Sequence, residues 1–129
     1  MSTLKHPFAT VEFREDKIIH IHYNSLLISL DNTKELITTI RENNPWKLAP
    51  IYISSEAFAN HEIVAQKYLA SKEIMNQTSA VAILVENTAQ KIGVNFFMRT
   101  MKPTKPTRFF NKQKEAIAWL RMHETIAKI

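Results

Sequence analysis

The chain has 129 residues, of which 45% are hydrophobic and 22% are charged, and its formal net charge is +5. This length predicts a single domain, residues 1–129, with enough apolar side chains to bury a core. The lack of cysteine excludes disulfides, thiolate nucleophiles and cysteine-ligated metals, and it agrees with a cytoplasmic protein. Residues 1–10 lack the apolar core of a signal peptide, and the longest apolar run, residues 80–85, is too short to span a bilayer. We therefore expect no transmembrane segment.

The first predicted element is a β-hairpin, because apolar and polar residues alternate over residues 10–14 and again over residues 17–23. Residues 26–30 are expected to form a short extension or a connection to a helix. Asp31 or Asn32 can cap this helix, since a short side-chain oxygen satisfies free N–H groups of the first turn. Its apolar face is expected to carry Leu36, Ile37 and Ile40.

Strands and helices then alternate, with strands predicted over residues 50–54, 79–85 and 107–110 and helices over residues 60–76 and 88–101. The proline-rich residues 102–106 end the second of these helices, because proline lacks an N–H group and clashes with the preceding turn. Asn111 is expected to cap a last helix that includes Ile126. The order ββαβαβαβα predicts an α/β domain whose sheet is mostly parallel, with the first hairpin as an antiparallel edge.

Four segments in this order resemble the STAS-like (SpoIIAA-like) domains of small bacterial proteins: Thr78-Ser-Ala-Val-Ala-Ile-Leu-Val-Glu86, Gly93-Val-Asn-Phe-Phe-Met98, Lys102-Pro-Thr-Lys-Pro-Thr-Arg-Phe-Phe110 and Ala116-Ile-Ala-Trp-Leu120. Such domains are related in fold to the anti-sigma-factor antagonists and, more loosely, to the lipid-binding CRAL-TRIO domains. The resemblance covers about residues 11–120. It implies a mixed sheet of about five strands, with the helices packed mainly on one face.

The anti-sigma-factor antagonists carry a serine that is phosphorylated between the third strand and the following helix. The matching stretch here is residues 53–62, and it departs from that pattern. Asn60, His61 and Glu62 stand where the phosphoacceptor is expected, while Ser54 and Ser55 lie earlier, at the strand end. We therefore transfer no functional residue from the antagonists, and the sequence leaves open whether Ser54 or Ser55 is modified.

Residues 87–114 contain seven basic side chains and no acidic one, whereas the rest of the chain holds ten basic against twelve acidic residues. The basic residues are Lys91, Arg99, Lys102, Lys105, Arg108, Lys112 and Lys114. Such a segment is a candidate partner surface. It contains no helix-turn-helix pattern, aromatic RNA-binding motif or glycine loop, so a solvated basic face is expected rather than a nucleic-acid site.

The predicted helix 88–101 is more apolar than docking on one sheet face requires. Lys91, Asn95, Arg99 and Lys102 follow spacings of 4, 4 and 3 and form one polar stripe, and apolar residues occupy most of the remaining circumference. Three interpretations stay open at this point. The helix is buried under its neighbours, or it contacts a protein, or it contacts a lipid.

Our leading hypothesis is a non-enzymatic, cytoplasmic protein-interaction module that forms a homodimer through helix 88–101 and loop 102–108. Three apolar residues would bury against the partner and four basic ones would surround them: Phe97, Met98 and Met101, then Arg99, Lys102, Lys105 and Arg108. The alternative is a domain that binds a lipid or a small anionic ligand with the same patch. An apolar cavity in the structure would favour this alternative.

The sequence offers few residue patterns suited to catalysis or to metal binding. His20 and His22 share one strand face at a spacing that can ligate a metal, but the sequence does not provide a clear third ligand. His61 and Glu62 are adjacent, and adjacent residues on a helix do not face each other. There is no glycine-rich phosphate loop or nucleophile elbow. We therefore expect no catalytic residue, no cofactor and no metal.

Overall fold

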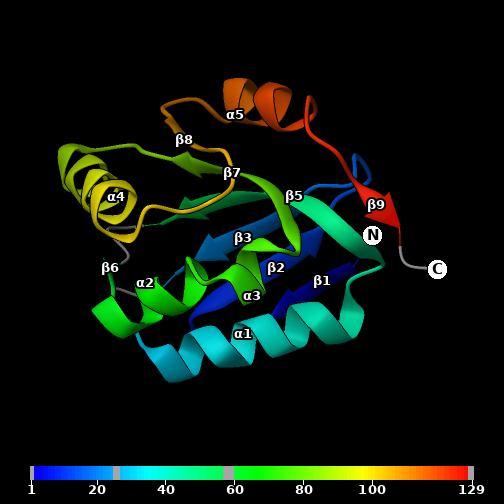
Figure 1. The fold of residues 1–129 in the computed structure, drawn as a ribbon, viewed down its shortest axis with the longest axis horizontal. Helices are drawn as coiled ribbons and strands as arrows, with labels where there is room; N and C mark the ends of the chain where they lie inside the picture. Colours follow the sequence, from blue (N-terminus) through cyan, green and yellow to red (C-terminus); the bar gives the residue numbers. More distant parts are fainter. Residues whose placement is uncertain (1, 25–26, 57–59, 128–129) are drawn as a thin grey trace.

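A mixed sheet occupies the centre of the computed structural model, which describes residues 2–24, 27–56 and 60–127 (Figure 1). Its seven strands are β1 (Ser2–Lys5), β2 (Ala9–Phe13), β3 (Ile19–Tyr23), β5 (Trp46–Ser55), β7 (Thr78–Leu84), β8 (Thr107–Phe110) and β9 (Ile126–Ala127). Two short strands, β4 (Leu27–Ile28) and β6 (Asn60–His61), form a separate parallel pair. The helices are α1 (Leu30–Asn43), α2 (Ile63–Leu69), α3 (Lys72–Met75), α4 (Thr88–Met101) and α5 (Gln113–Leu120).

The strand order β1-β2-β3-β5-β7-β8 divides the sheet into two parts. The pairs β1–β2 and β2–β3 are antiparallel, whereas β3–β5, β5–β7 and β7–β8 are parallel. Each parallel pair is joined by a helical crossover, as parallel strands require. The short β9 pairs antiparallel with the beginning of β5. The predicted hairpin and the mostly parallel remainder are therefore confirmed.

Helices cover the two faces of the sheet unequally, with α1, α2 and α3 on one face and α5 on the other (Figure 1). Alternation along β3 sends Ile19 and Ile21 to the first face, where they join a core that includes the fully buried Leu36 of α1. On the second face, Ile117 and Leu120 of α5 pack on Tyr52 and on the small residues of β7. Burying one side chain such as Leu36 contributes about 1.5–3 kcal/mol to stability.

The N-cap of helix α1 lies two or three residues earlier than the sequence predicts. Ser29 is its N-cap, and the Ser29 Oγ accepts a hydrogen bond from the backbone N–H of Asn32 at 3.0 Å. The Asn32 Oδ1 accepts a hydrogen bond from the backbone N–H of Ser29 at 3.2 Å, so the side chain of each residue pairs with the backbone N–H of the other. Asp31 therefore lies in the first turn and is not the cap. Leu26, in the predicted connection, lies outside the described residues.

The predicted helix 60–76 is wrong in two respects. Asn60 and His61 pair with β4 as a strand, and the remaining helix is divided between α2 and α3. At the division, Ser71 Oγ–H donates to the carbonyl of Tyr68 at 2.6 Å. The Tyr68 carbonyl thus bonds to a side chain where a continuing helix would use a backbone N–H.

The chain end also differs from its prediction. The N-cap residue of helix α5 is Lys112 rather than Asn111, its side chain makes no capping hydrogen bond, and the helix ends at Leu120. Ile126 therefore lies in β9, opposite Leu48 of β5, instead of continuing the helix. With β1 and β9 included, the sheet has seven strands where about five were expected.

Candidate functional site

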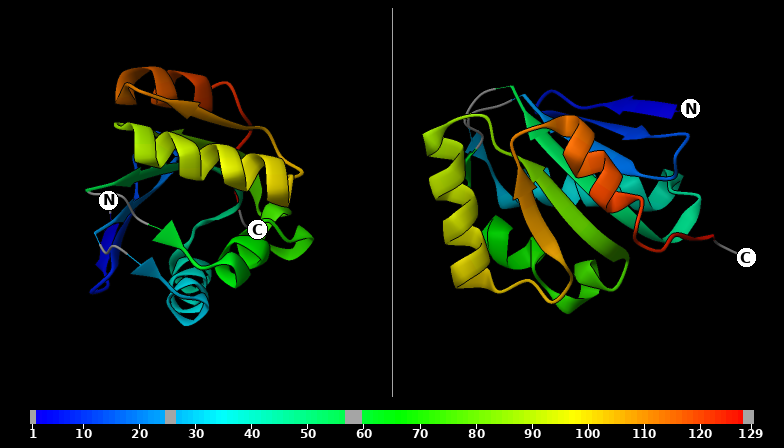
Figure 2. Two further views of the ribbon diagram at one scale, coloured as in Figure 1. Left: turned by 90° about the vertical axis from the view of Figure 1, so that its left-hand side faces the viewer. Right: turned by 90° about the horizontal axis from the view of Figure 1, so that it is seen from above.

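Helix α4 is held firmly at its beginning and loosely along the rest of its length. Asn87 caps it by accepting the backbone N–H of Gln90, and the side chain of Gln90 accepts the backbone N–H of Glu86 at 2.6 Å. Gln90 is also its one buried residue. The helix lies at the side of the molecule between α2 and β8 (Figure 2). The other residues of α4 are half-buried or exposed.

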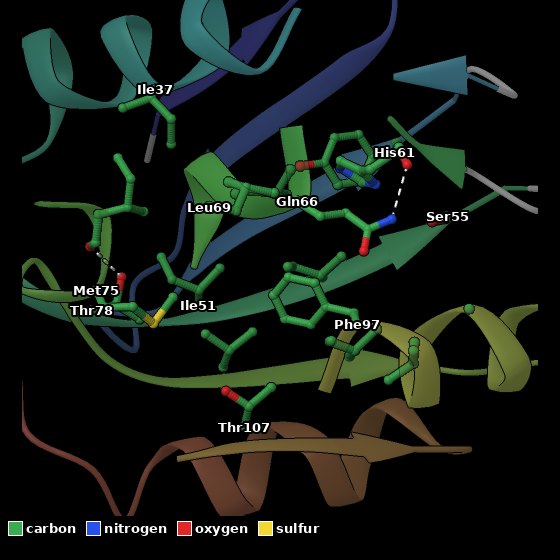
Figure 3. Close-up of a pocket in the computed structure, with 18 of the residues that line it drawn as sticks. Ile37, Ile51, Ser55, His61, Gln66, Leu69, Met75, Thr78, Phe97 and Thr107 are labelled. Atoms are coloured by element: carbon green, nitrogen blue, oxygen red, sulfur yellow. Dashed lines mark hydrogen bonds between the residues drawn. The ribbon is translucent and has the colours of Figure 1, made fainter. Parts of the chain in front are cut away.

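A cavity of about 520 Å³ lies between the sheet, the helices α1, α2 and α3, and the inner side of α4 (Figure 3). The sheet contributes branched apolar side chains, and α4 contributes Val94 and Phe97. Ile51 and Ile53 stay partly exposed although β5 is a central strand, because they border this space. Volumes of roughly 300–1,000 Å³ with mainly apolar walls are typical of small-molecule sites.

The cavity has an apolar mouth. Ile63 of α2 and Ile92 and Phe96 of α4 line it, yet they are 47%, 64% and 41% exposed. These three side chains therefore lie where the space between α2 and α4 meets solvent. A ligand that enters there would cover large apolar side chains that water now reaches.

One end of the cavity is polar. The side-chain amide nitrogen of Gln66, Nε2, donates to the backbone carbonyl of His61 at 3.0 Å (Figure 3). The Oε1 of Gln66 and the Nε2 of His61 are both buried, and neither has a hydrogen-bond partner among the described residues. The His61 ring packs edge-on against Tyr23, with ring centroids 4.7 Å apart. Burial lowers the pKa of His61 to about 4, so the imidazole is neutral near neutral pH.

The residues predicted for an interaction surface are distributed over different environments. Phe97 points into the cavity (Figure 3), whereas Met98 and Met101 are half-buried along α4. Arg99 and Lys102 are exposed, and Lys102 adopts a left-handed backbone conformation, with φ of 47°, where the helix ends. Lys105 is half-buried in the following loop.

Arg108 is separated from this group. Its guanidinium lies over the rings of Phe110 and Trp119, 5.2 and 5.6 Å from their centroids, on the α5 side of the sheet. The cavity lies on the opposite side. The structure therefore assembles the α4 residues near the cavity but does not bring Arg108 to them.

The two serines at the end of β5 face opposite sides of the sheet. Ser55 lines the cavity, whereas Ser54 is buried on the α5 side between two histidines. Ser54 Oγ lies 2.7 Å from His20 Nε2 and 2.7 Å from His22 Nδ1. Because a hydroxyl has one hydrogen, it donates to one imidazole and accepts from the other. Both histidines thus have a structural partner, and the described residues contain no group of three or more side chains suited to a metal.

Sequence reasoning did not identify the polar end of the cavity. It placed His61 in a helix next to Glu62, and it did not single out Gln66. The signal that pointed to this region was the high apolar content of residues 88–101, which form one wall of the cavity and part of its mouth.

In the described part of the chain, no helix is long and apolar enough to cross a membrane.

Comparisons with known proteins agree with the fold and do not name an activity. No curated protein matches the chain. An uncharacterised protein of the DUF3478 family from Shewanella loihica PV-4, whose crystal structure is described as SpoIIAA-like, superposes with a TM-score of 0.58 at 13% identity, covering 93% of this chain and 98% of that one. This likeness shows the fold, as the sequence resemblance predicted. Over residues 12–124 the chain matches DUF7793, a domain of unknown function, and it belongs to that family.

Proposed function

We propose that this protein is a non-enzymatic binding domain that holds a small apolar or amphipathic molecule in the cavity beneath α4. The observation that carries the proposal is the cavity itself, about 520 Å³ of space with Ile51, Ile53 and Phe97 among its walls. An amphipathic ligand would cover this apolar surface at about 25 cal/mol for each Å² removed from water. The loose packing of α4 would give the ligand a way in. We also propose a cytoplasmic location, in keeping with the lack of cysteine.

Native mass spectrometry of protein purified without detergent tests the proposal, together with titration of the neutral fluorescent probe N-phenylnaphthylamine. We expect a protein that carries added mass, or an empty protein that binds the probe with increased fluorescence. Val94→Trp should abolish probe binding, because Val94 lines the cavity. Thr100→Trp is the matched control, since Thr100 is exposed on the same helix and does not line the cavity. Equal probe binding by both variants would contradict the proposal.

A protein-interaction role for α4, including a homodimer, is the second candidate. The exposure of Ile92 and Phe96 favours it, because solvent-exposed apolar side chains on one helix are suited to contact with a partner. The exposed cations Lys91, Arg99 and Lys102 would then orient an acidic partner surface. A concentration series in the same mass spectrometry experiment separates the two candidates. A dimer without added mass, weakened by Phe96→Glu, would support interaction over ligand binding.

A further inference from the structure

The polar end of the cavity contains an acceptor that the protein does not use. Gln66 is only 8% exposed, and one N–H of its amide group donates to the His61 carbonyl. Its Oε1 has no partner among the described residues, and Figure 3 shows the Gln66 side chain directed into the space above Phe97. Buried side-chain acceptors are nearly always paired in folded proteins. The position is therefore suited to a hydrogen-bond donor on a bound molecule.

His61 adds a second unused polar atom to the same end of the cavity. Its Nε2 is buried without a partner, although the residue as a whole is partly exposed. The hydrogen bond from Gln66 to the His61 carbonyl keeps these two side chains together. A neutral imidazole nitrogen can either donate or accept, so it adapts to a head group that already donates to Gln66.

The charges around this end do not favour an anion. Glu62 is the nearest ionisable neighbour in sequence, and its carboxylate accepts the backbone N–H of Leu30 at 3.1 Å. Arg41 is the one cationic side chain among the described lining residues, and Glu73 of α3 contacts it at 3.1 Å. Gln66 Oε1 is an acceptor. An ionised carboxylate or phosphate placed against it carries no hydrogen to donate, so the two groups could not form a hydrogen bond. Burying such an unpaired charge is strongly unfavourable.

We propose that this end of the cavity receives an uncharged head group that donates a hydrogen bond to Gln66 Oε1, namely a hydroxyl or a primary amide at the end of a single apolar chain. The inference rests on the proposed function and narrows it, because it disfavours fatty carboxylates and phospholipids as ligands. Ser55 lines the cavity close to this end (Figure 3), and the ring of Tyr23 packs against His61.

Displacement of N-phenylnaphthylamine from the wild-type protein tests this with ligands that share one chain length. Dodecanol and dodecanamide supply a neutral donor, dodecyl methyl ether lacks the donor, and dodecanoate carries a charge. We expect dodecanol to bind at least about 5-fold more tightly than the ether, which is the usual net effect of one hydrogen bond. Dodecanoate should bind more weakly than dodecanol. An ether that binds as tightly as the alcohol, or a carboxylate that binds more tightly, would overturn the inference.

A variant distinguishes recognition of the head group from binding in the cavity. Gln66→Met keeps the side-chain length and removes the acceptor, so it should still bind the probe and lose the preference for alcohol over ether. Gln113→Met, at the exposed beginning of α5, is the control and should keep that preference. If Gln66→Met does not fold by circular dichroism, the wild-type ratio of alcohol to ether decides alone. A wild-type protein that binds neither the probe nor any dodecyl ligand would instead refute the proposed function.

Discussion

His61 makes the stability of the folded protein depend on pH. Its pKa falls from 6.5 to about 4 because burial disfavours the charged imidazole. The unfolded chain therefore binds a proton in a range where the folded protein does not. The contribution of His61 is fully present above about pH 6.5 and is lost as the pH falls toward 4. A shift of this size corresponds to a loss of up to about 3 kcal/mol.

Urea unfolding at a series of pH values measures this effect. The wild-type free energy of unfolding should decrease steadily between pH 6.5 and 4, and His61→Phe should decrease less over the same range. Phenylalanine keeps the edge-on contact with Tyr23 and removes the titration. Some slope will remain in the variant, since burial also lowers the pKa of His20. Parallel curves for the two proteins would show that His61 is not buried in its neutral form.

At the scale of elements, the beginning of α1 distinguishes two neighbouring polar residues. Ser29 exchanges hydrogen bonds with Asn32, whereas Asp31 lies in the first turn, where its negative charge interacts with the helix dipole. Ser29→Ala should lower the free energy of unfolding by about 1 kcal/mol. Asp31→Ala is the matched control and should cost about 0.3–1 kcal/mol, decreasing with added salt. Chemical denaturation of both variants checks the assignment, and a larger loss in Asp31→Ala would restore Asp31 as the cap.

The sequence predicts an element well where local chemistry marks both of its ends. Both bounds of α4 were predicted, and its end was predicted from residues Lys102 to Pro106, which cannot continue a helix. The structure adds that Asn87 caps its beginning. The division between α2 and α3 was missed, since neither Ala70 nor Ser71 is a helix breaker by type. The short strand β9 was missed because it depends on pairing with β5, far earlier in the chain, which periodicity does not report. Strand β1 pairs with the neighbouring β2, but its four residues show too little apolar alternation to predict a strand.

The cavity results from how side chains pack in three dimensions, which the apolar periodicity of the sequence does not show. An apolar periodicity shows which side of α4 avoids water, but it does not show whether neighbouring side chains reach that side. Phe97 illustrates this point, because its position on the apolar side agrees equally with a core, a partner surface and a cavity wall. Of the three interpretations left open for residues 88–101, the structure disfavours only full burial under neighbouring helices, because α4 has one buried residue.

On the scale of the whole molecule, packing is uneven. The core between α1 and the strands β2, β3 and β5 contains residues that are almost fully buried, among them Val11, Ile19 and Leu36. Helix α4, in contrast, has one buried residue and borders an apolar space. Segments with few buried contacts open locally at a lower free energy than the core does. The side of the molecule that contains α4 is therefore expected to respond most strongly to a ligand.

Amide hydrogen exchange measures that response across the whole chain. Without ligand, amides in the second half of α4 should exchange faster than those of α1, which buries Leu36, Ile37 and Ile40 against the core. Saturation with dodecanol should slow exchange in α4 and α2 and leave β1 and β2 unchanged, because the ligand would fill the space between α4 and the sheet. At a ligand concentration 100 times its Kd, global stability should also rise by about 2.7 kcal/mol. The same experiment on Val94→Trp, which fills that space with a side chain, should show slow exchange in α4 without ligand. Rapid exchange of α4 in every case would mean that the helix does not close over a bound molecule.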